Sequence, residues 1–228
     1  MFSSWVLYAS MAKKTQCLLI ILFLLTNSNV WSTQTGSVRT TPASLFGYKE
    51  IQKQNLNLFP QWLSVLERHI LNQKDADSCR SAKFNQCHLK QWQAFLKGIK
   101  HLPVNQQIKQ VNKYANEKEY ILDIENYGVV DYWATPKEFL GNSGDCEDYA
   151  IIKMLSMKWL GYDINSMRVV VVQDTNLRIA HAVMAIERNN DILILDNQIE
   201  EVISHAAIFH YVPVYSVNEN NWWMHVPN

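Results

Sequence analysis

The sequence predicts an α+β fold in which helices precede an antiparallel sheet. Apolar residues recur at helical spacing in three segments between residues 59 and 114. Runs of β-branched residues separated by turns then fill residues 167–195, and short apolar segments continue to residue 224. Between these two halves lies a fourth helical pattern, which begins at a cysteine surrounded by acids.

The first 32 residues have the pattern of a secretory signal peptide. A pair of lysines precedes an apolar run over residues 17–25, which is too short to span a bilayer well. We expect cleavage after Ser32, which leaves residues 33–228 as a single domain; an uncleaved membrane anchor is the alternative. The mature chain is then slightly acidic and has no basic tail, so nucleic acid is not expected as a partner.

Three helices are expected in the first half of the mature chain. Their apolar stripes consist of Phe59, Trp62, Leu63, Leu66 and Ile70, of Leu89, Trp92, Phe95, Leu96 and Ile99, and of Val104, Ile108, Val111 and Tyr114. Pro103 precedes the third stripe and suits the first turn of a helix, where a backbone N–H is not needed. Such stripes usually pack in a core, so we assign them to structure and not to a ligand site.

A fourth helix is expected to begin within the motif Asp-Cys-Glu-Asp at residues 145–148. Turn residues precede the motif, Asp145 is placed to cap the helix, and Asp148 occupies the reciprocal position. The apolar residues keep helical period as far as Gly161, which fits a C-terminal stop. Cys146 therefore falls in the first turn, where amide groups and the helix dipole favour the nucleophilic thiolate. A buried, inert cysteine is the competing interpretation.

The acids of this motif predict a cation site. Their negative charges would raise the pKa of the neighbouring thiol, so a positive charge is expected among them. Carboxylate oxygens of Asp145, Glu147 and Asp148 suit Ca²⁺ better than zinc. The spacing of an EF-hand loop is absent, and an acidic helix start solvated by water is the alternative.

Three strands follow, and two of them place a histidine near an aspartate. Residues 167–172 are expected to form a buried strand, and residues 179–187 and 192–195 a hairpin closed by a short turn. In such a hairpin His181 and Asp196 share a face, directly opposite or diagonal, within reach of a hydrogen bond. Taken separately, His181 would be an ordinary core histidine and Asp196 a turn residue at a strand end.

After residue 198 the pattern changes to short strands. We expect them at residues 207–211, 214–217 and 222–224. Together with the hairpin they would complete the antiparallel sheet.

The order of cysteine, histidine and aspartate, with the sequence around each, resembles the bacterial transglutaminase-like cysteine proteinases, in particular the periplasmic LapG proteases. The matching motifs are DYWATPKEFL at 131–140, GDCEDYA at 144–150, AHAV at 180–183 and LDNQ at 195–198. The resemblance extends from about residue 45 to the C-terminus. It implies a papain-like or transglutaminase-like core with Cys146 as nucleophile, His181 as general base and acid, and Asp196 as orienting carboxylate.

The resemblance also implies a biological role. It implies calcium-dependent cleavage of a large surface adhesin near its N-terminus, at a site with paired alanines, with release of the adhesin and dispersal of biofilm. Asp145, Glu147 and Asp148 would bind the calcium ion. It further implies a periplasmic enzyme that an inner-membrane receptor for cyclic di-GMP sequesters. A transglutaminase-type acyltransferase, which shares the triad, and a catalytically silent calcium-binding module that docks a receptor are the alternatives.

Two further assignments concern Trp133 and the remaining cysteines. The indole N–H of Trp133 is a candidate oxyanion donor beside the backbone N–H of Cys146, and packing in the core is the alternative. Cys79 and Cys87 are a candidate disulfide pair in an oxidising periplasm, although their geometry cannot be read from sequence.

Overall fold

The computed structural model describes residues 44–74 and 86–228, and all of these belong to one compact unit, Arg39–Asn228. The expected signal peptide, residues 1–32, lies outside the described residues, as does Cys79 of the candidate disulfide. Both assignments therefore stay predictions. Within the described part of the chain, no helix has the length and apolar character needed to cross a membrane.

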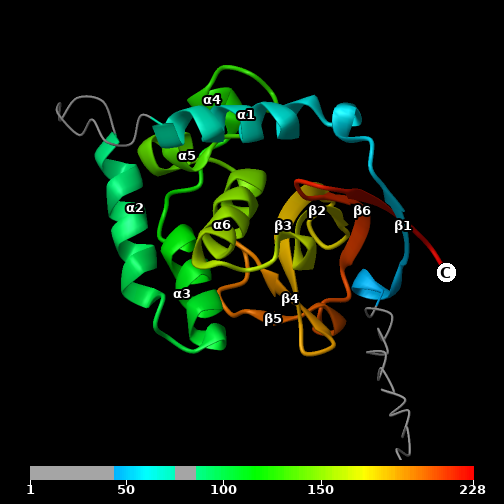
Figure 1. Cartoon of the computed structure of the whole chain (residues 1–228). Coiled ribbons are helices and arrows are strands. Elements are labelled where there is room, and N and C mark those ends of the chain that lie inside the picture. Colours follow the sequence, from blue (N-terminus) through cyan, green and yellow to red (C-terminus); the bar gives the residue numbers. More distant parts are fainter. Residues whose placement is uncertain (1–43, 75–85) are drawn as a thin grey trace, which may run out of the picture. The chain divides into compact units, whose positions relative to one another are not determined.

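Helices gather on one side of a seven-stranded antiparallel sheet, which confirms the predicted α+β class (Figure 1). The helices are α1 (Pro60–Lys74), α2 (Gln86–Ile99), α3 (Val104–Asn116), α4 (Asp123–Asn126), α5 (Pro136–Asn142) and α6 (Cys146–Leu160). The strands are β1 (Lys49–Lys53), β2 (Met167–Asp174), β3 (Ile179–Arg188), β4 (Asp191–Leu195), β5 (Ile203–Ser204), β6 (Tyr211–Val217) and β7 (Trp222–Val226). They are ordered β1-β7-β6-β2-β3-β4-β5 across the sheet.

The first three helices form where their apolar stripes predict them. Trp62 of α1, Trp92 of α2 and Ile108 of α3 are fully buried in one shared core. Ile70 of the first stripe is exposed instead. Pro103 is the N-cap residue of α3, one position before the first turn.

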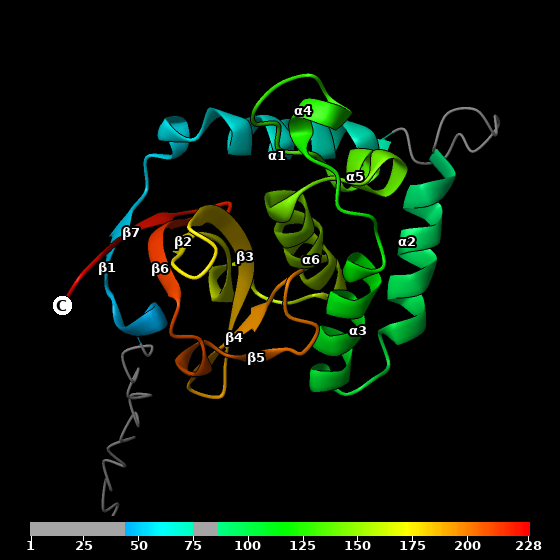
Figure 2. The ribbon, with the colours of Figure 1, turned by 180° about the vertical axis from the view of Figure 1, so that it is seen from behind.

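Helix α6 lies at the centre of the described unit, with the sheet on one side and helices α2, α3 and α5 around the rest (Figures 1 and 2). Every residue from Glu147 to Met157 is therefore buried, whereas the sequence pattern predicts a single buried face. The helix ends as predicted, because Gly161 adopts a left-handed conformation with φ of 101°. Its first residue is Cys146, which the surrounding elements consequently hold in place.

The start of α6 differs from the prediction in one respect. Asp145 is the N-cap residue, but its side chain makes no capping hydrogen bond. Its carboxylate instead lies among other acids, within 4.8 Å of ligand atoms of Asp123 and Asp148. The N-cap position predicted for Asp145 is therefore confirmed, but the capping hydrogen bond of its side chain is not formed, since this carboxylate belongs to an acidic cluster.

The predicted hairpin is confirmed. Strands β3 and β4 pair Met184 with Leu195 and Arg188 with Asp191. The two residues of its turn, Asn189 and Asn190, have positive φ angles of 51° and 63°, which asparagine tolerates better than most residues. Extending this register by one pair would set Asp196 diagonal to His181 across the strands.

Two parts of the sheet differ from the prediction. The strand expected at residues 207–211 is wrong, because His205–Ala207 form a 3₁₀ turn capped by the Ser204 side chain and β6 begins only at Tyr211. Strand β1 was not predicted at all. It precedes the helices and forms an edge of the sheet by pairing with β7.

Candidate active site

The β3–β4 hairpin brings His181 and Asp196 into direct contact. His181 lies on β3 and Asp196 follows the last residue of β4. The imidazole Nε2 and the carboxylate Oδ1 are 2.9 Å apart, and both side chains are almost fully buried. The predicted pairing is therefore present, and it leaves Nδ1 of the imidazole for another partner.

Two more donors hold the Asp196 carboxylate. The Tyr211 hydroxyl donates to Oδ2 at 2.6 Å, and the backbone N–H of Gln198 donates to Oδ1 at 2.9 Å. Burial by itself would raise the pKa of Asp196, but the hydrogen bond and charge of His181 and these two donors outweigh it, so the pKa lies below its ordinary value. Asp196 is consequently an ionised carboxylate at neutral pH.

Cys146 lies against the same strand. The backbone N–H of Ala182, the residue after His181, donates to its sulfur. The thiol itself points to Glu147, with Sγ 3.3 Å from Oε2. On the imidazole side, the Gln198 amide nitrogen is 3.4 Å from Nδ1 of His181. The structure thus gathers cysteine, histidine and aspartate at one place, where α6 begins beside β3.

The environment of Cys146 disfavours a thiolate when no cation is present. Burial raises the pKa of this thiol, and the negative charges of Glu147 and Asp145 raise it further. The hydrogen bond from the Ala182 N–H lowers the pKa of the thiol but does not outweigh these effects. A cation among the acids would oppose the rise in the thiol pKa that their negative charges cause. The sequence already indicates this conflict between the acids and an activated thiol.

Within residues 44–74 and 86–228, five carboxylic acids surround the start of α6, two more than the sequence predicts. Asp145, Glu147 and Asp148 belong to the predicted motif, and Asp123 of α4 and Asp131 of the following loop join them. Ligand atoms of Asp123, Asp145 and Asp148 lie within 4.8 Å of one another, and so do those of Asp123, Asp131 and Glu147. We call these five residues the acidic cluster.

The acidic cluster has the properties of a cation site. Three of its buried oxygens have no hydrogen-bond partner among the residues that the structure describes, namely Asp123 Oδ1, Asp145 Oδ1 and Asp148 Oδ2. Burial raises the pKa of Glu147 to about 10 and that of Asp123 to about 6, and it raises the pKa of Asp148 well above its ordinary value. The acids must therefore share either protons or a cation. An oxygen-rich, negatively charged set of this kind fits calcium.

Backbone groups of the Asp131–Ala134 loop orient two acids of the cluster. The N–H of Tyr132 donates to Asp123 Oδ2 at 2.5 Å, and the N–H of Ala134 donates to Asp148 Oδ1 at 2.6 Å. In each acid the second oxygen is the one without a partner. The loop therefore holds one oxygen of each carboxylate and leaves the other for the cluster.

Trp133 packs in the core. It is 7 % exposed, and its ring meets that of Trp62 edge to face at a centroid distance of 6.3 Å. Its indole N–H donates to Asp131 Oδ1 at 3.1 Å. The packing alternative accounts for this side chain, so the backbone N–H of Cys146 is the better candidate for an oxyanion donor.

Comparisons with known proteins place the chain in a protein family. The model of the family described as bacterial transglutaminase-like cysteine proteinase, BTLCP, matches residues 74–228. Solved structures of Legionella pneumophila LapG, one of them calcium-bound and one EGTA-treated, match with a TM-score of 0.58 and 29 % identity. The matches cover 68 % of this chain and 84–86 % of the LapG chains. No curated protein matches. The chain therefore belongs to the bacterial transglutaminase-like cysteine proteinase family.

Proposed function

We propose that the chain is a calcium-dependent cysteine endopeptidase with Cys146, His181 and Asp196 as its triad. The observation that carries the proposal is the buried His181–Asp196 hydrogen bond of 2.9 Å beside a cysteine at the first residue of a helix. These are the three kinds of group, nucleophile, base and orienting acid, that acyl transfer by a cysteine uses, which supports the proposal.

The proposal gives each member a role. In this proposal Asp196 accepts the Nε2 proton of His181. Nδ1, which the Gln198 amide meets at 3.4 Å in this structure, would take the proton of the Cys146 thiol once that thiol turns away from Glu147. The thiolate attacks the scissile carbonyl, the new S–C bond forms, and the carbonyl electron pair moves to oxygen, where the backbone N–H of Cys146 can stabilise it. The imidazolium then protonates the leaving amine as the C–N bond breaks. Water, deprotonated by the same imidazole, hydrolyses the thioester and regenerates the thiol.

The acidic cluster would hold calcium through Asp145, Glu147 and Asp148, joined by Asp123 and Asp131. Bound calcium supplies positive charge that compensates these carboxylates beside the thiol. The three buried oxygens without partners support this assignment, as do the relatives described as calcium-bound and EGTA-treated LapG. Glu147 accepts from the thiol in this structure, so its release from Cys146 is part of the expected change on calcium binding.

The biological role rests on the resemblance to LapG proteases. We propose a periplasmic enzyme that cleaves the N-terminal region of a large surface adhesin at paired alanines and so promotes biofilm dispersal. Sequestration by an inner-membrane receptor for cyclic di-GMP would control it. A transglutaminase-type acyltransferase is the second candidate, because the same triad and thioester would serve it.

Product analysis separates the two candidates. The enzyme is incubated with an N-terminal adhesin fragment that contains paired alanines, in the presence of calcium and an excess of a fluorescent primary amine. The masses of the products are then measured by mass spectrometry. A peptidase yields two fragments, one with a free carboxylate at its new C-terminus and the other with a new N-terminal amine. Intact chains that carry the amine would contradict the peptidase assignment and favour the acyltransferase, whereas an amine at a new C-terminus would still report cleavage of the peptide bond through the thioester.

A further inference from the structure

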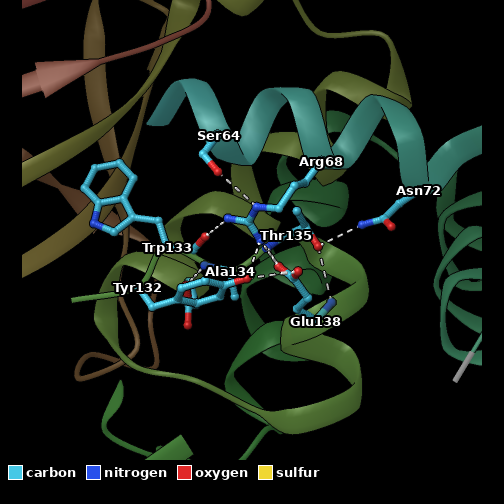
Figure 3. A network of polar contacts seen from close by, with 9 residues as sticks. Ser64, Arg68, Asn72, Tyr132, Trp133, Ala134, Thr135 and Glu138 are labelled. Atoms are coloured by element: carbon cyan, nitrogen blue, oxygen red, sulfur yellow. Dashed lines mark hydrogen bonds and ion pairs between the residues drawn. The ribbon is translucent and has the colours of Figure 1, made fainter. Parts of the chain in front are cut away.

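Helix α1 makes a set of polar contacts with the Asp131–Ala134 loop, whose N–H groups bond two acids of the acidic cluster (Figure 3). All of α1 except its last residue precedes the segment that the family model matches. Arg68 is the centre of these contacts. Its guanidinium donates to the Trp133 carbonyl at 2.5 Å and to the Tyr132 hydroxyl at 2.8 Å, and it pairs with Glu138. It also lies over the Tyr132 ring, 4.8 Å from the centroid.

The partners of Arg68 are themselves fixed. Glu138 accepts from the Thr135 backbone N–H at 2.8 Å as part of a capping box at the start of α5. Glu138 also accepts from the Tyr132 hydroxyl at 3.1 Å. Asn72, one turn further along α1, donates to the Thr135 hydroxyl at 3.1 Å. Helix α1 therefore contacts the loop and helix α5 at several points, and Arg68 makes most of these contacts.

One peptide group joins Arg68 to the acidic cluster. The carbonyl of Trp133 accepts from Arg68, and the N–H of the same peptide, on Ala134, donates to Asp148 Oδ1 at 2.6 Å. A cationic donor on the carbonyl polarises the peptide and strengthens its N–H as a donor. Rotation of this peptide would break both bonds at once. The orientation of Asp148, which is fully buried, thus depends on a side chain of α1.

We propose that Arg68 is a positioning residue for the calcium site, because it fixes the Trp133–Ala134 peptide that orients Asp148 toward the acidic cluster. The inference rests on the calcium site of the proposed function. It extends that site to a residue that touches none of the five acids and that no local motif marks.

Lysine could not replace Arg68 in this role. Arg68 uses its planar fork to reach a carbonyl, a hydroxyl and a carboxylate at the same time, while Nε donates to Ser64 at 3.2 Å. A lysine ammonium is a single point charge on a flexible stem and could satisfy only part of this set. Arg68→Lys therefore keeps the charge and removes the geometry, which makes it the informative substitution.

The test measures calcium affinity with CaCl₂ alone. Wild type, Arg68→Lys and Arg68→Gln are titrated calorimetrically, and their unfolding midpoints are recorded in EGTA. Arg168→Lys is the matched control. Arg168 is buried, pairs with Glu50 at 2.8 Å and lies over Trp223, and these contacts join β2 to β1 and β7, away from the acidic cluster.

The Kd for calcium is expected to rise about tenfold or more in both Arg68 variants. Substituting residues that hold the metal ligands in place commonly weakens metal affinity by this much. In the Arg168→Lys control the unfolding midpoint should fall while the calcium Kd stays at the wild-type value. If folded Arg68→Lys and Arg68→Gln bind calcium as tightly as wild type, Arg68 is merely structural and the inference fails. If wild type itself binds no calcium, the calcium site fails, and this inference fails with it.

Discussion

At the scale of single residues, the structure assigns more to Asp196 than the sequence does. Sequence reasoning pairs it with His181, and that pair is present. It does not find the Tyr211 hydroxyl, which holds the second carboxylate oxygen at 2.6 Å. No local pattern marks Tyr211, because the contact depends on how β6 lies in the sheet.

Tyr211→Phe should lower kcat/KM by about tenfold or more, since a hydrogen bond to a charged group contributes roughly 1.5–3 kcal/mol. Asp196→Asn serves as the comparison and should lose far more, although not all activity, because the imidazole is then misoriented. Steady-state kinetics on one peptide substrate measures both. A Tyr211→Phe enzyme at full rate would show that His181 and Gln198 alone hold the carboxylate.

At the scale of secondary-structure elements, the predictions succeed where the signal is local. Apolar period predicts α1, α2, α3 and α6, and the β-branched runs predict β2, β3 and β4. Strand β1, Lys-Glu-Ile-Gln-Lys, has no such signal and forms because β7 is available from the other end of the chain. The acids Asp123 and Asp131 were missed for the same reason, since only tertiary packing brings them to Cys146.

The turn before α6 offers an element-scale prediction. A Cβ atom at Gly144 would lie 2.0 Å from Asp148 Oδ2, so Gly144→Ala should displace this carboxylate from the acidic cluster. We expect the calcium-induced rise of the unfolding midpoint to be lost or strongly reduced. Gly98→Ala is the matched control, because a Cβ at Gly98 in α2 meets no heavy atom within 4 Å. Equal calcium responses of the two variants would contradict the assignment of Asp148 as a ligand.

At the scale of the whole molecule, the proposed calcium site predicts that calcium binding depends on pH. The pKa values of Glu147, Asp123 and Asp148 are raised by burial, to about 10 and about 6 for the first two. In the metal-free protein the protonated acids stabilise the fold below their ordinary pKa, and this stabilisation is lost as pH rises through the raised pKa. Calcium requires the deprotonated form, so the two effects oppose each other.

The difference between the unfolding midpoints in calcium and in EGTA should therefore increase from pH 5 to pH 8. Other buried groups also titrate differently from their ordinary values, since burial lowers the pKa of His69 and His225 to about 4 and that of Lys153 to about 7. Their contributions are common to both conditions and cancel in the difference. Thermal scans at fixed ionic strength test this, and a calcium effect that shrinks with rising pH would contradict it.

The central claim is that Cys146 cleaves a peptide bond only when the acidic cluster binds calcium. The most direct measurement is the cleavage rate of the adhesin fragment by wild type and by Cys146→Ala, each in calcium and in EGTA. We predict cleavage by wild type in calcium alone, with activity restored when calcium is returned after EGTA, and no cleavage by folded Cys146→Ala in either condition. Cleavage by Cys146→Ala, or equal wild-type rates in calcium and EGTA, would contradict the claim.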